Sequence, residues 1–356
     1  MMKKAEMAFV RALCSFYSDS LNEEMLNYAT PEVLGFLFYN RMQSVAYGHL
    51  KQKDLLGGLN REFRNSLKAA YDYNISVNYS YFQCVDWIND LLRRSNCQFA
   101  MLKGALLCKI YPEGYRTSND IDLLISPEEV TFVGETLKRE GFRQGYIRNS
   151  NFIPASRMEI ISSKMMRGET VPYIKKVDLP GMEYLEVDIN FSLDYKSGKE
   201  DVLQEFLNTA QEVNFRGMSV TTLKEKDFFL HLCCHLYKEA TTLPWIQMKR
   251  DMSLYKFCDI YMLLETMTKE DIQDIYEHAI RFGLEKICAF TMLYTASLFD
   301  QKTPIVKNLA ESVLWNDKQI MHQVFDPKGK KQLIYTEEDL VKRFFCDSRE
   351  SLLMEE

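Results

Sequence analysis

The spacing of apolar residues predicts a helical beginning to the chain. Between Arg61 and Arg94 apolar residues recur every three or four positions, as on one face of a long helix. The expected stripe consists of Phe63, Leu67, Ala70, Asn74 or Ile75, Tyr79, Phe82, Val85, Ile88 and Leu92. Residues 1–20 have the character of an amphipathic helix and lack that of a signal peptide. We therefore expect an N-terminal helical region over residues 1–96.

The pattern in the centre of the chain favours short strands and helices separated by turn residues. Expected strands are 98–102, 120–125, 171–177 and 184–193, and expected helices are 105–111 and 127–140. Pro112 and Gly114 mark a loop before the second strand. Residues 142–170 show no regular pattern. This part predicts a compact α/β core over residues 97–195.

Helical periodicity returns after Lys224. Expected helices are 227–237, 252–266, 269–282, 284–299 and one more in the tail from Glu337. A C-terminal helical region over residues 196–356 completes the prediction. The expected fold class is therefore α+β, with a small mixed-sheet core between two helical regions.

Composition narrows the class of protein. The 356 residues include 44 Lys and Arg against 50 Asp and Glu, and the net charge of −6 weighs against non-specific nucleic-acid binding as the main role. Nine cysteines without a Cys-x-x-Cys pair indicate reduced thiols. No apolar stretch is long enough to cross a bilayer. We expect a soluble cytoplasmic protein with no membrane partner.

Two aspartates lie one residue apart in the apolar run DIDLLI. Successive side chains of a strand point to opposite faces, so Asp120 and Asp122 project together. Asp188 in the strand at 184–193 shares a face with Glu186 and Asn190. Adjacent carboxylates repel one another unless a cation lies between them, and Mg²⁺ prefers carboxylate oxygens. Three such groups can hold two metals for phosphoryl transfer. In the structural alternative, Asp120 is a loop residue that caps the strand and Asp122 lies at a solvated sheet edge.

Further residues with the chemistry of phosphate binding lie close to this strand. Gly104 opens the short helix, where its backbone could approach a phosphate, and Lys103 adds a positive charge. Arg116, four residues before Asp120, is either a bidentate phosphate donor or a solvated loop arginine.

The segment LKGALL…YPEGYRTSNDIDLLI resembles the nucleotidyltransferase fold of the DNA polymerase β superfamily. It is most similar to a family of uncharacterised bacterial nucleotidyltransferases with an LKG…DiDlL signature. LEVDINFSL resembles the strand of that family's third carboxylate. LKEKDFFLHLCCHLYKE and LYKFCDIYMLL resemble its helical half.

This resemblance assigns roles to individual residues. It implies that Gly104 belongs to the turn that holds the triphosphate and that Asp188 activates the acceptor hydroxyl. Two positions depart from the family: Ala105 replaces a common serine or glycine, and Asn190 replaces a frequent histidine. The candidate catalytic and metal-binding residues are Asp120, Asp122 and Asp188, and the candidate nucleotide-binding residues are Lys103, Gly104, Ala105 and Arg116.

The expected activity is transfer of a nucleoside monophosphate from a nucleoside triphosphate, such as ATP, to an acceptor with release of pyrophosphate. Mg²⁺ or Mn²⁺ is the expected cofactor. The preferred base is undetermined, and the acceptor is a small molecule, a protein or RNA. Three alternatives remain: a toxin-type nucleotidyltransferase that acts on transfer RNA, a non-catalytic nucleotide-binding member, and an unrelated helical scaffold.

Two other features carry weaker signals. His231 and His235 have the spacing of zinc ligands, but the glutamate of a His-Glu-x-x-His motif is absent, which favours packing roles. The segment 142–176 holds seven basic residues against two acidic ones: Arg143, Arg148, Arg157, Lys164, Arg167, Lys175 and Lys176 against Glu159 and Glu169. It is either a solvated flexible loop or a flap that neutralises a triphosphate or an anionic acceptor.

Overall fold

The chain forms two compact units. The computed structural model describes residues 2–193, 200–215, 217–300, 304–314, 317–329 and 332–355. Unit 1 comprises Met1–Tyr71 and Leu232–Glu356, and unit 2 comprises Asp72–His231. The unit boundaries fall inside two helices, α4 (Arg61–Arg94) and α9 (Glu225–Ala240).

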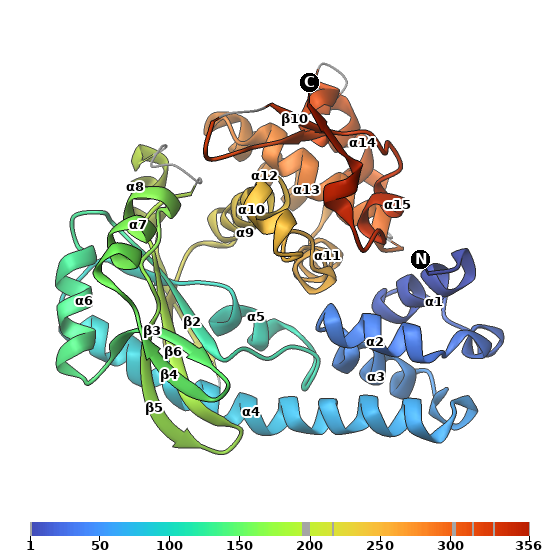
Figure 1. Ribbon diagram of the computed structural model, residues 1–356, viewed down its shortest axis with the longest axis horizontal. Coiled ribbons are helices and arrows are strands. Elements are labelled where there is room, and N and C mark those ends of the chain that lie inside the picture. Colours follow the sequence, from blue (N-terminus) through green and yellow to red (C-terminus); the bar gives the residue numbers. More distant parts are fainter. Residues whose placement is uncertain are drawn as a thin grey trace. The chain divides into compact units, whose positions relative to one another are not determined.

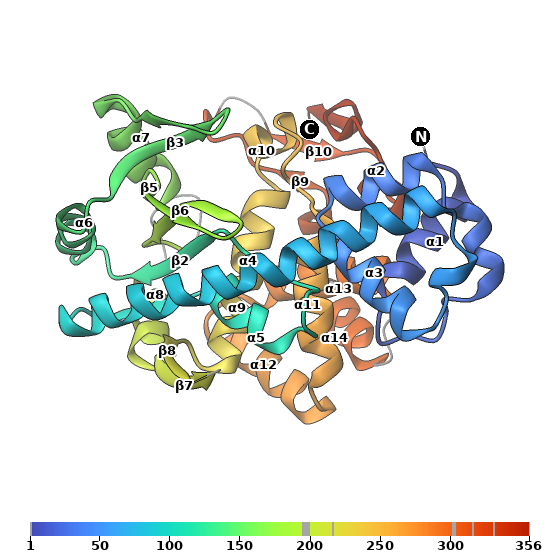
Figure 2. The same ribbon diagram turned by 90° about the horizontal axis from the view of Figure 1, so that it is seen from below.

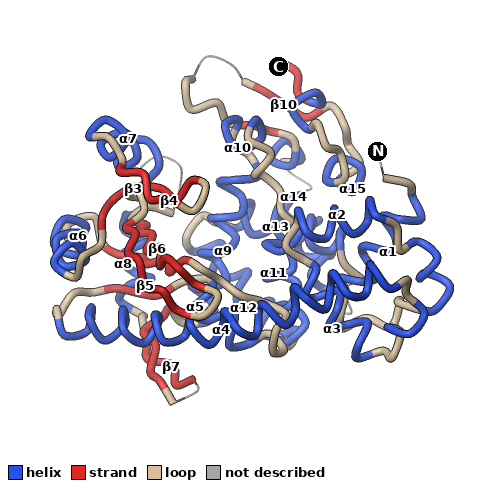
Figure 3. Tube along the Cα trace, turned by 60° about the horizontal axis from the view of Figure 1, so that its bottom comes forward, coloured by secondary structure: helices blue, strands red, loops and turns tan. Residues whose placement is uncertain are grey.

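Unit 2 is built on a mixed sheet. Its strands are β1 (Phe99–Met101), β2 (Asp120–Ile125), β3 (Arg143–Arg148), β4 (Asn151–Pro154), β5 (Tyr173–Leu179), β6 (Met182–Asn190), β7 (Gln211–Phe215) and β8 (Met218–Thr222). Among the described residues they form one sheet in the order β4-β3-β5-β6-β2-β1-β8-β7. Strand β2 runs parallel to β6 and antiparallel to β1. Figure 3 draws the strands of this sheet in red, among them β3, β4, β5 and β6. The expected α+β fold class is confirmed.

Helices cover one face of this sheet. The helices of unit 2 besides α4 are α5 (Gly104–Ile110), α6 (Val130–Arg139), α7 (Arg157–Arg167) and α8 (Glu200–Asn208). The second half of α4 runs along the sheet, and α6 also lies beside the sheet (Figure 1). Ile121 and Leu123 of β2 join Val187 of β6 in a core with apolar residues of α4 and α6. The aspartates of β2, which alternate with these residues, therefore belong to the other face.

The long helix at 61–94 is confirmed, but part of its expected buried stripe is wrong. Ile75 and Tyr79 are exposed, at 37% and 69% of their surface, while Asn74 and Asn78 are buried. Each asparagine donates a side-chain hydrogen bond to a loop carbonyl, at 3.1 Å and 2.9 Å. Carbonyls of a buried loop need donors, so polar residues lie in the buried stripe: Asn74, one of the two alternatives expected there, and Asn78 in place of Tyr79.

The sequence pattern missed several elements of unit 2. Residues 142–170, expected to be irregular, form β3, β4 and α7. Helix α7 has local signals that the apolar pattern hides: Ser156 and Glu159 form a capping box, and Gly168 ends the helix with a φ of +62°. Its large side chains are exposed, for example Met158 and Met165 at 75% each. A helix without a buried stripe leaves no 3.6-residue pattern.

The region 196–356, expected to be helical, also contains strands. Strands β7 and β8 form a hairpin (Figure 2) and add two positions to the sheet of unit 2. Each strand has five residues, too few for an alternation to stand out against the surrounding helical pattern. The helix expected in the tail from Glu337 is present as the short helix α15 (Leu340–Phe344), but the tail then forms the unexpected strand β11 (Leu353–Glu355).

Unit 1 consists mainly of helices. Its further helices are α1 (Lys4–Cys14), α2 (Pro31–Tyr39), α3 (Gln43–Gln52), α10 (Leu243–Gln247), α11 (Leu254–Thr266), α12 (Lys269–Arg281), α13 (Glu285–Leu298) and α14 (Pro304–Leu314). A small sheet joins β11 to β10 (Leu333–Tyr335) and β9 (Gln323–Val324). Among the described residues no helix has the length and apolar character needed to span a bilayer.

Candidate active site

Four carboxylates meet on the two central strands β2 and β6. The parallel register places Asp120 opposite Glu186 and Asp122 opposite Asp188. Residues paired across neighbouring strands share a face, so all four side chains belong to the face that α4 and α6 leave free. Asp122 is only 4% exposed, and β2 has neighbours on both sides. The structural alternative, which put Asp122 at a solvated edge, is therefore wrong.

Asp120, Asp122, Glu186 and Asp188 form an acidic row, and Glu169 and Asn190 extend it. Glu169 forms an antiparallel bridge with Asn190, and the flanking hydrogen bonds run from Thr170 to Ile189 and from Phe191 to Gly168. This pattern marks Glu169 and Asn190 as a non-hydrogen-bonded pair, whose side chains lie close on one face. Asn190 is 5% exposed, and its amide nitrogen has no hydrogen-bond partner among the residues that the structure describes. The sequence predicted that Glu186 shares this face but not that it is a site residue, and it gave no signal that Glu169 lies here.

Lys103 supplies a positive charge to the row. Its Nζ donates to Oδ1 of Asp122 at 2.6 Å, and the two side chains are 20% and 5% exposed. The backbone of Lys103 has φ +43° and ψ −112°, a conformation that favours glycine. Thus the structure joins two predicted site residues that lie 19 positions apart, in a contact that no sequence pattern indicated.

The crowding of acidic groups raises their pKa values. Burial raises the pKa of Asp122, with a smaller contribution from Asp120, while Lys103 opposes the shift. Burial, followed by Asp120 and Asp122, raises the pKa of Glu186 to about 7. Burial and the neighbouring Glu186 hold the pKa of Asp188 well above its ordinary value. The row therefore retains protons that isolated carboxyl groups would release.

Helix α4 fixes the loop that precedes β2. The hydroxyl of Tyr81 donates to the backbone oxygen of Asp120 at 3.0 Å, and Ser118 Oγ donates to the Asp120 carboxylate at 2.5 Å. Asn78 holds the Arg116 carbonyl. The guanidinium of Arg116 donates to the carbonyl of the next residue, Thr117. These α4 residues position the site loop, and sequence reasoning had no signal for them beyond polar residues on a helix.

Gly104 allows a close approach between α5 and this loop. A Cβ at Gly104 would lie 2.5 Å from the Cβ of Ser118 and 2.8 Å from the hydroxyl of Tyr81. The adjacent Ala105 is 1% exposed and belongs to the hydrophobic core. Packing next to Asp120 therefore requires a glycine at position 104. The side chain of Ala105 points to the core.

The donor chemistry of the row suits a hard cation, but its arrangement is not that of a preformed metal site. No group of three His, Cys, Asp or Glu side chains is placed to hold a metal ion in the described part of the chain. Asp120, Asp122 and Asp188 offer the oxygen ligands that Mg²⁺ takes. Lys103 holds Oδ1 of Asp122, so a metal ion bound to that oxygen would take the place of the ammonium.

The two histidines of α9 have separate surroundings. His235 lies 3.3 Å from the carboxylate of Glu239, which is also paired with Lys256. His231 is buried at 3% exposure. These surroundings agree with an ion-pair role for His235 and a packing role for His231.

Much of the basic segment 142–176 has partners within its own unit. Lys175 lies over the ring of Trp87 at 4.7 Å and donates to the Glu140 carbonyl at 2.6 Å. Lys176 pairs with Asp178 at 3.3 Å, and Arg167 pairs with Glu169 at 3.7 Å. The segment forms β3, β4, α7 and the start of β5, so it is not a flexible loop.

Comparison with known proteins places the chain in a family. The family model described as uncharacterised nucleotidyltransferase matches residues 30–300. No curated protein sequence matches the chain. A solved structure of an antigenic nucleotidyltransferase-like protein from Paracoccidioides brasiliensis is similar at 13% identity and a TM-score of 0.33, covering 56% of this chain and 86% of that one. The antibiotic-resistance factor ANT(2'')-Ia is similar at 11% identity and a TM-score of 0.34, covering 57% and 92%. With most of its length matched by the family model, the chain belongs to the uncharacterised nucleotidyltransferases.

Proposed function

We propose that this protein transfers a nucleoside monophosphate from a nucleoside triphosphate to an acceptor and releases pyrophosphate, with Mg²⁺ or Mn²⁺ as cofactor. Family membership supports nucleotide transfer in general. The observation that carries the more specific proposal is the register of β2 and β6. It pairs Asp122 with Asp188 and Asp120 with Glu186 on one face of the sheet. Asp120, Asp122 and Asp188 of this arrangement are also the three carboxylates that the resemblance to the polymerase β superfamily implies.

Each residue of the row would have a distinct task. Asp120, Asp122 and Asp188 would hold the metal, which supplies charge neutralisation for the triphosphate. The acceptor oxygen would form a bond to the α-phosphorus while the bond to the β-phosphate oxygen breaks and pyrophosphate leaves. Asp188, to which the resemblance assigns activation of the acceptor, would take the proton from the acceptor hydroxyl. Lys103 would contact a phosphate of the nucleotide.

The test is to incubate the protein with each labelled nucleoside triphosphate, Mg²⁺ and fractionated cell extract. We expect one fraction to contain a molecule that becomes labelled as pyrophosphate is released. The Asp122→Asn variant should give no label, and Asp178→Asn, which changes an exposed aspartate of the same unit, should label like the parent. Equal labelling by the parent and Asp122→Asn would contradict the proposal, because the metal-binding row would then be dispensable.

A transfer-RNA acceptor is the second candidate, and helix α7 favours it. Arg157 and Arg167 are exposed on this helix and Lys164 is half-buried. If they contact a nucleic-acid backbone, neutralising all three should weaken RNA binding and flatten its dependence on salt. Neutralising Arg61, Arg64 and Lys68 of α4 is the matched control. Fluorescence anisotropy with labelled transfer RNA at two salt concentrations distinguishes the two triples, and equal affinity of both would count against an RNA acceptor.

A further inference from the structure

Lys103 has a backbone conformation that only a side-chain role explains well. Its φ of +43° with ψ −112° lies outside the regions that residues with a Cβ normally occupy. A glycine would adopt it without strain. Such strain persists where the surrounding structure enforces it and is concentrated at functional sites. The lysine side chain at this position is therefore the feature to explain.

The side chain is used to neutralise the most buried carboxylate of the row. Its ammonium lies 2.6 Å from Oδ1 of Asp122, whose side chain is 5% exposed. A charge-assisted bond at this distance and burial is among the stronger polar contacts in proteins. Asp122 faces Asp188 across the strand pair, with Asp120 and Glu186 one step along the register. Lys103 thus places a positive charge next to the most buried carboxylate of the acidic row.

We propose that Lys103 is a built-in counter-ion that occupies Asp122 in the substrate-free protein and leaves it when metal and nucleotide bind together. The inference rests on the proposed function. A metal ion that binds Oδ1 of Asp122 without nucleotide displaces the ammonium, which then loses its carboxylate partner. A metal ion arriving with a triphosphate offers the ammonium a phosphate in exchange.

The exchange makes the two ligands cooperative. Because the nucleotide supplies the new partner for Lys103, it raises the affinity for the metal, and by linkage the metal raises the affinity for the nucleotide by the same factor. The absence of a preformed three-ligand metal site among the described residues agrees with this order of events. Lys103 is in this view a positioning residue that weakens the binding of metal in the absence of nucleotide.

The experiment measures Mn²⁺ binding, by electron paramagnetic resonance of free Mn²⁺, with and without a non-hydrolysable nucleoside triphosphate. Measurements at about pH 8 lie above the pKa of about 7 of Glu186. We expect Lys103→Met to bind Mn²⁺ alone about ten-fold more tightly than the parent, in the range of ordinary coupling between sites. The triphosphate should then raise its Mn²⁺ affinity less than it raises that of the parent.

Three further variants make the result specific. Lys103→Gly removes the ammonium and relieves the backbone strain, so it should bind Mn²⁺ like Lys103→Met even if the methionine variant folds poorly. Lys103→Arg keeps the charge and should behave like the parent. Lys176→Met removes a lysine that is paired with Asp178 and Glu183 on the same sheet, and it should also behave like the parent.

Two outcomes would overturn the inference, and they differ from each other. If the parent binds Mn²⁺ with triphosphate and both Lys103→Met and Lys103→Gly bind Mn²⁺ alone no more tightly than the parent, the counter-ion role is wrong and the proposed function stands. If neither the parent nor any variant binds Mn²⁺, with or without triphosphate, the metal-dependent function itself fails, and the counter-ion role with it.

Discussion

At the scale of single residues, Asp122 combines deep burial with one charged partner. Its side chain is 5% exposed and accepts a hydrogen bond from Lys103. Burial raises its pKa in spite of the lysine, so the charged form is held at a cost. A neutral amide of the same shape removes this cost and still offers an oxygen to Lys103.

We therefore expect Asp122→Asn to abolish transfer while the metal-free protein melts at the same temperature or slightly higher. Stabilisation by added Mg²⁺ should shrink, because less binding energy is linked to the native state. Activity assays and thermal melts with and without Mg²⁺ check both parts. A variant with full activity and unchanged stabilisation by Mg²⁺ would assign Asp122 a structural role only.

Gly104 is the second single residue on which the site depends. In Gly104→Ala the new methyl group would meet Ser118 and Tyr81, the two residues that hold Asp120. Overpacking of this kind costs about 1–3 kcal/mol, and the displaced loop should lower activity as well. Gly35→Ala is the control: nothing lies within 4 Å of that Cβ, and an alanine inside α2 should be neutral or stabilising by up to about 1 kcal/mol. Urea denaturation and activity assays compare the two, and equal stability of both variants would show that the loop adapts freely.

At the scale of elements, the pair of strands β2 and β6 predicts how stability depends on pH. The pKa of Glu186 rises from 4.5 to about 7 on folding. Between these values the folded protein keeps a proton that the unfolded chain releases, so the free energy of unfolding falls as pH rises through this window. The raised pKa of Asp188 acts in the same direction.

The metal-free protein should therefore resist urea better at about pH 5 than at about pH 8. Glu186→Gln should reduce this difference, because its side chain does not titrate. Glu183→Gln, at an exposed position of the same strand, serves as the control and should leave the difference unchanged. If the parent is more stable at the higher pH in the absence of metal, the acidic row is not protonated in the way inferred here.

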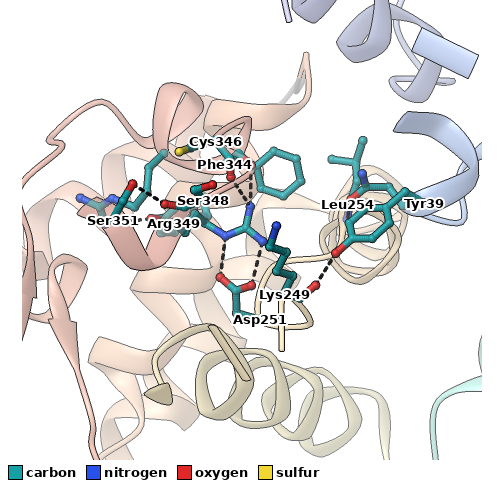
Figure 4. A network of polar contacts seen from close by, with 12 residues as sticks. Tyr39, Lys249, Asp251, Leu254, Phe344, Cys346, Ser348, Arg349 and Ser351 are labelled. Atoms are coloured by element: carbon teal, nitrogen blue, oxygen red, sulfur yellow. Dashed lines mark hydrogen bonds and ion pairs between the residues drawn. The ribbon is translucent and has the colours of Figure 1, made fainter. Parts of the chain in front are cut away.

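At the scale of the whole molecule, buried arginines hold the C-terminal tail to the helices of unit 1. Arg349 forms a bidentate pair with Asp251, at 2.6 Å and 2.7 Å, and also donates to the carbonyls of Phe344 and Cys346 (Figure 4). The two paired side chains are 9% and 0% exposed. Arg343, fully buried, donates to the hydroxyl of Tyr294 at 2.9 Å.

Removing one partner of such a pair leaves a buried charge without compensation. We expect Arg349→Met to lower the free energy of unfolding by about 3–5 kcal/mol. Lys307→Met breaks an exposed ion pair with Glu311 in the same unit, and it should change stability by less than about 1 kcal/mol. Urea denaturation followed by circular dichroism measures both. Equal effects of the two substitutions would mean that the tail is held by apolar packing and not by Arg349.

The sequence by itself determined the features that depend on local periodicity. The helix at 61–94 and the strand at 120–125 follow from spacings of 3.6 and 2 residues, and the second spacing also puts Asp120 and Asp122 on one face. The acidic strand at 184–193 was found in the same way, as β6 (Met182–Asn190). The pattern of α4 is visible because the helix buries one face against the core, and those of β2 and β6 because carboxylates alternate with core residues along part of each strand.

Only the tertiary structure decided which distant residues share the site. The register of β2 and β6 brings Glu186 to Asp120, the bridge to Asn190 brings in Glu169, and a turn in an unusual backbone conformation aims Lys103 at Asp122. Strand register is fixed by the whole sheet and its core, and not by the residues of one strand. The roles of Asn78 and Tyr81 are likewise decided by the tertiary structure. Their polar groups gain partners only when α4 lies against the loop before β2, a contact that no local spacing records.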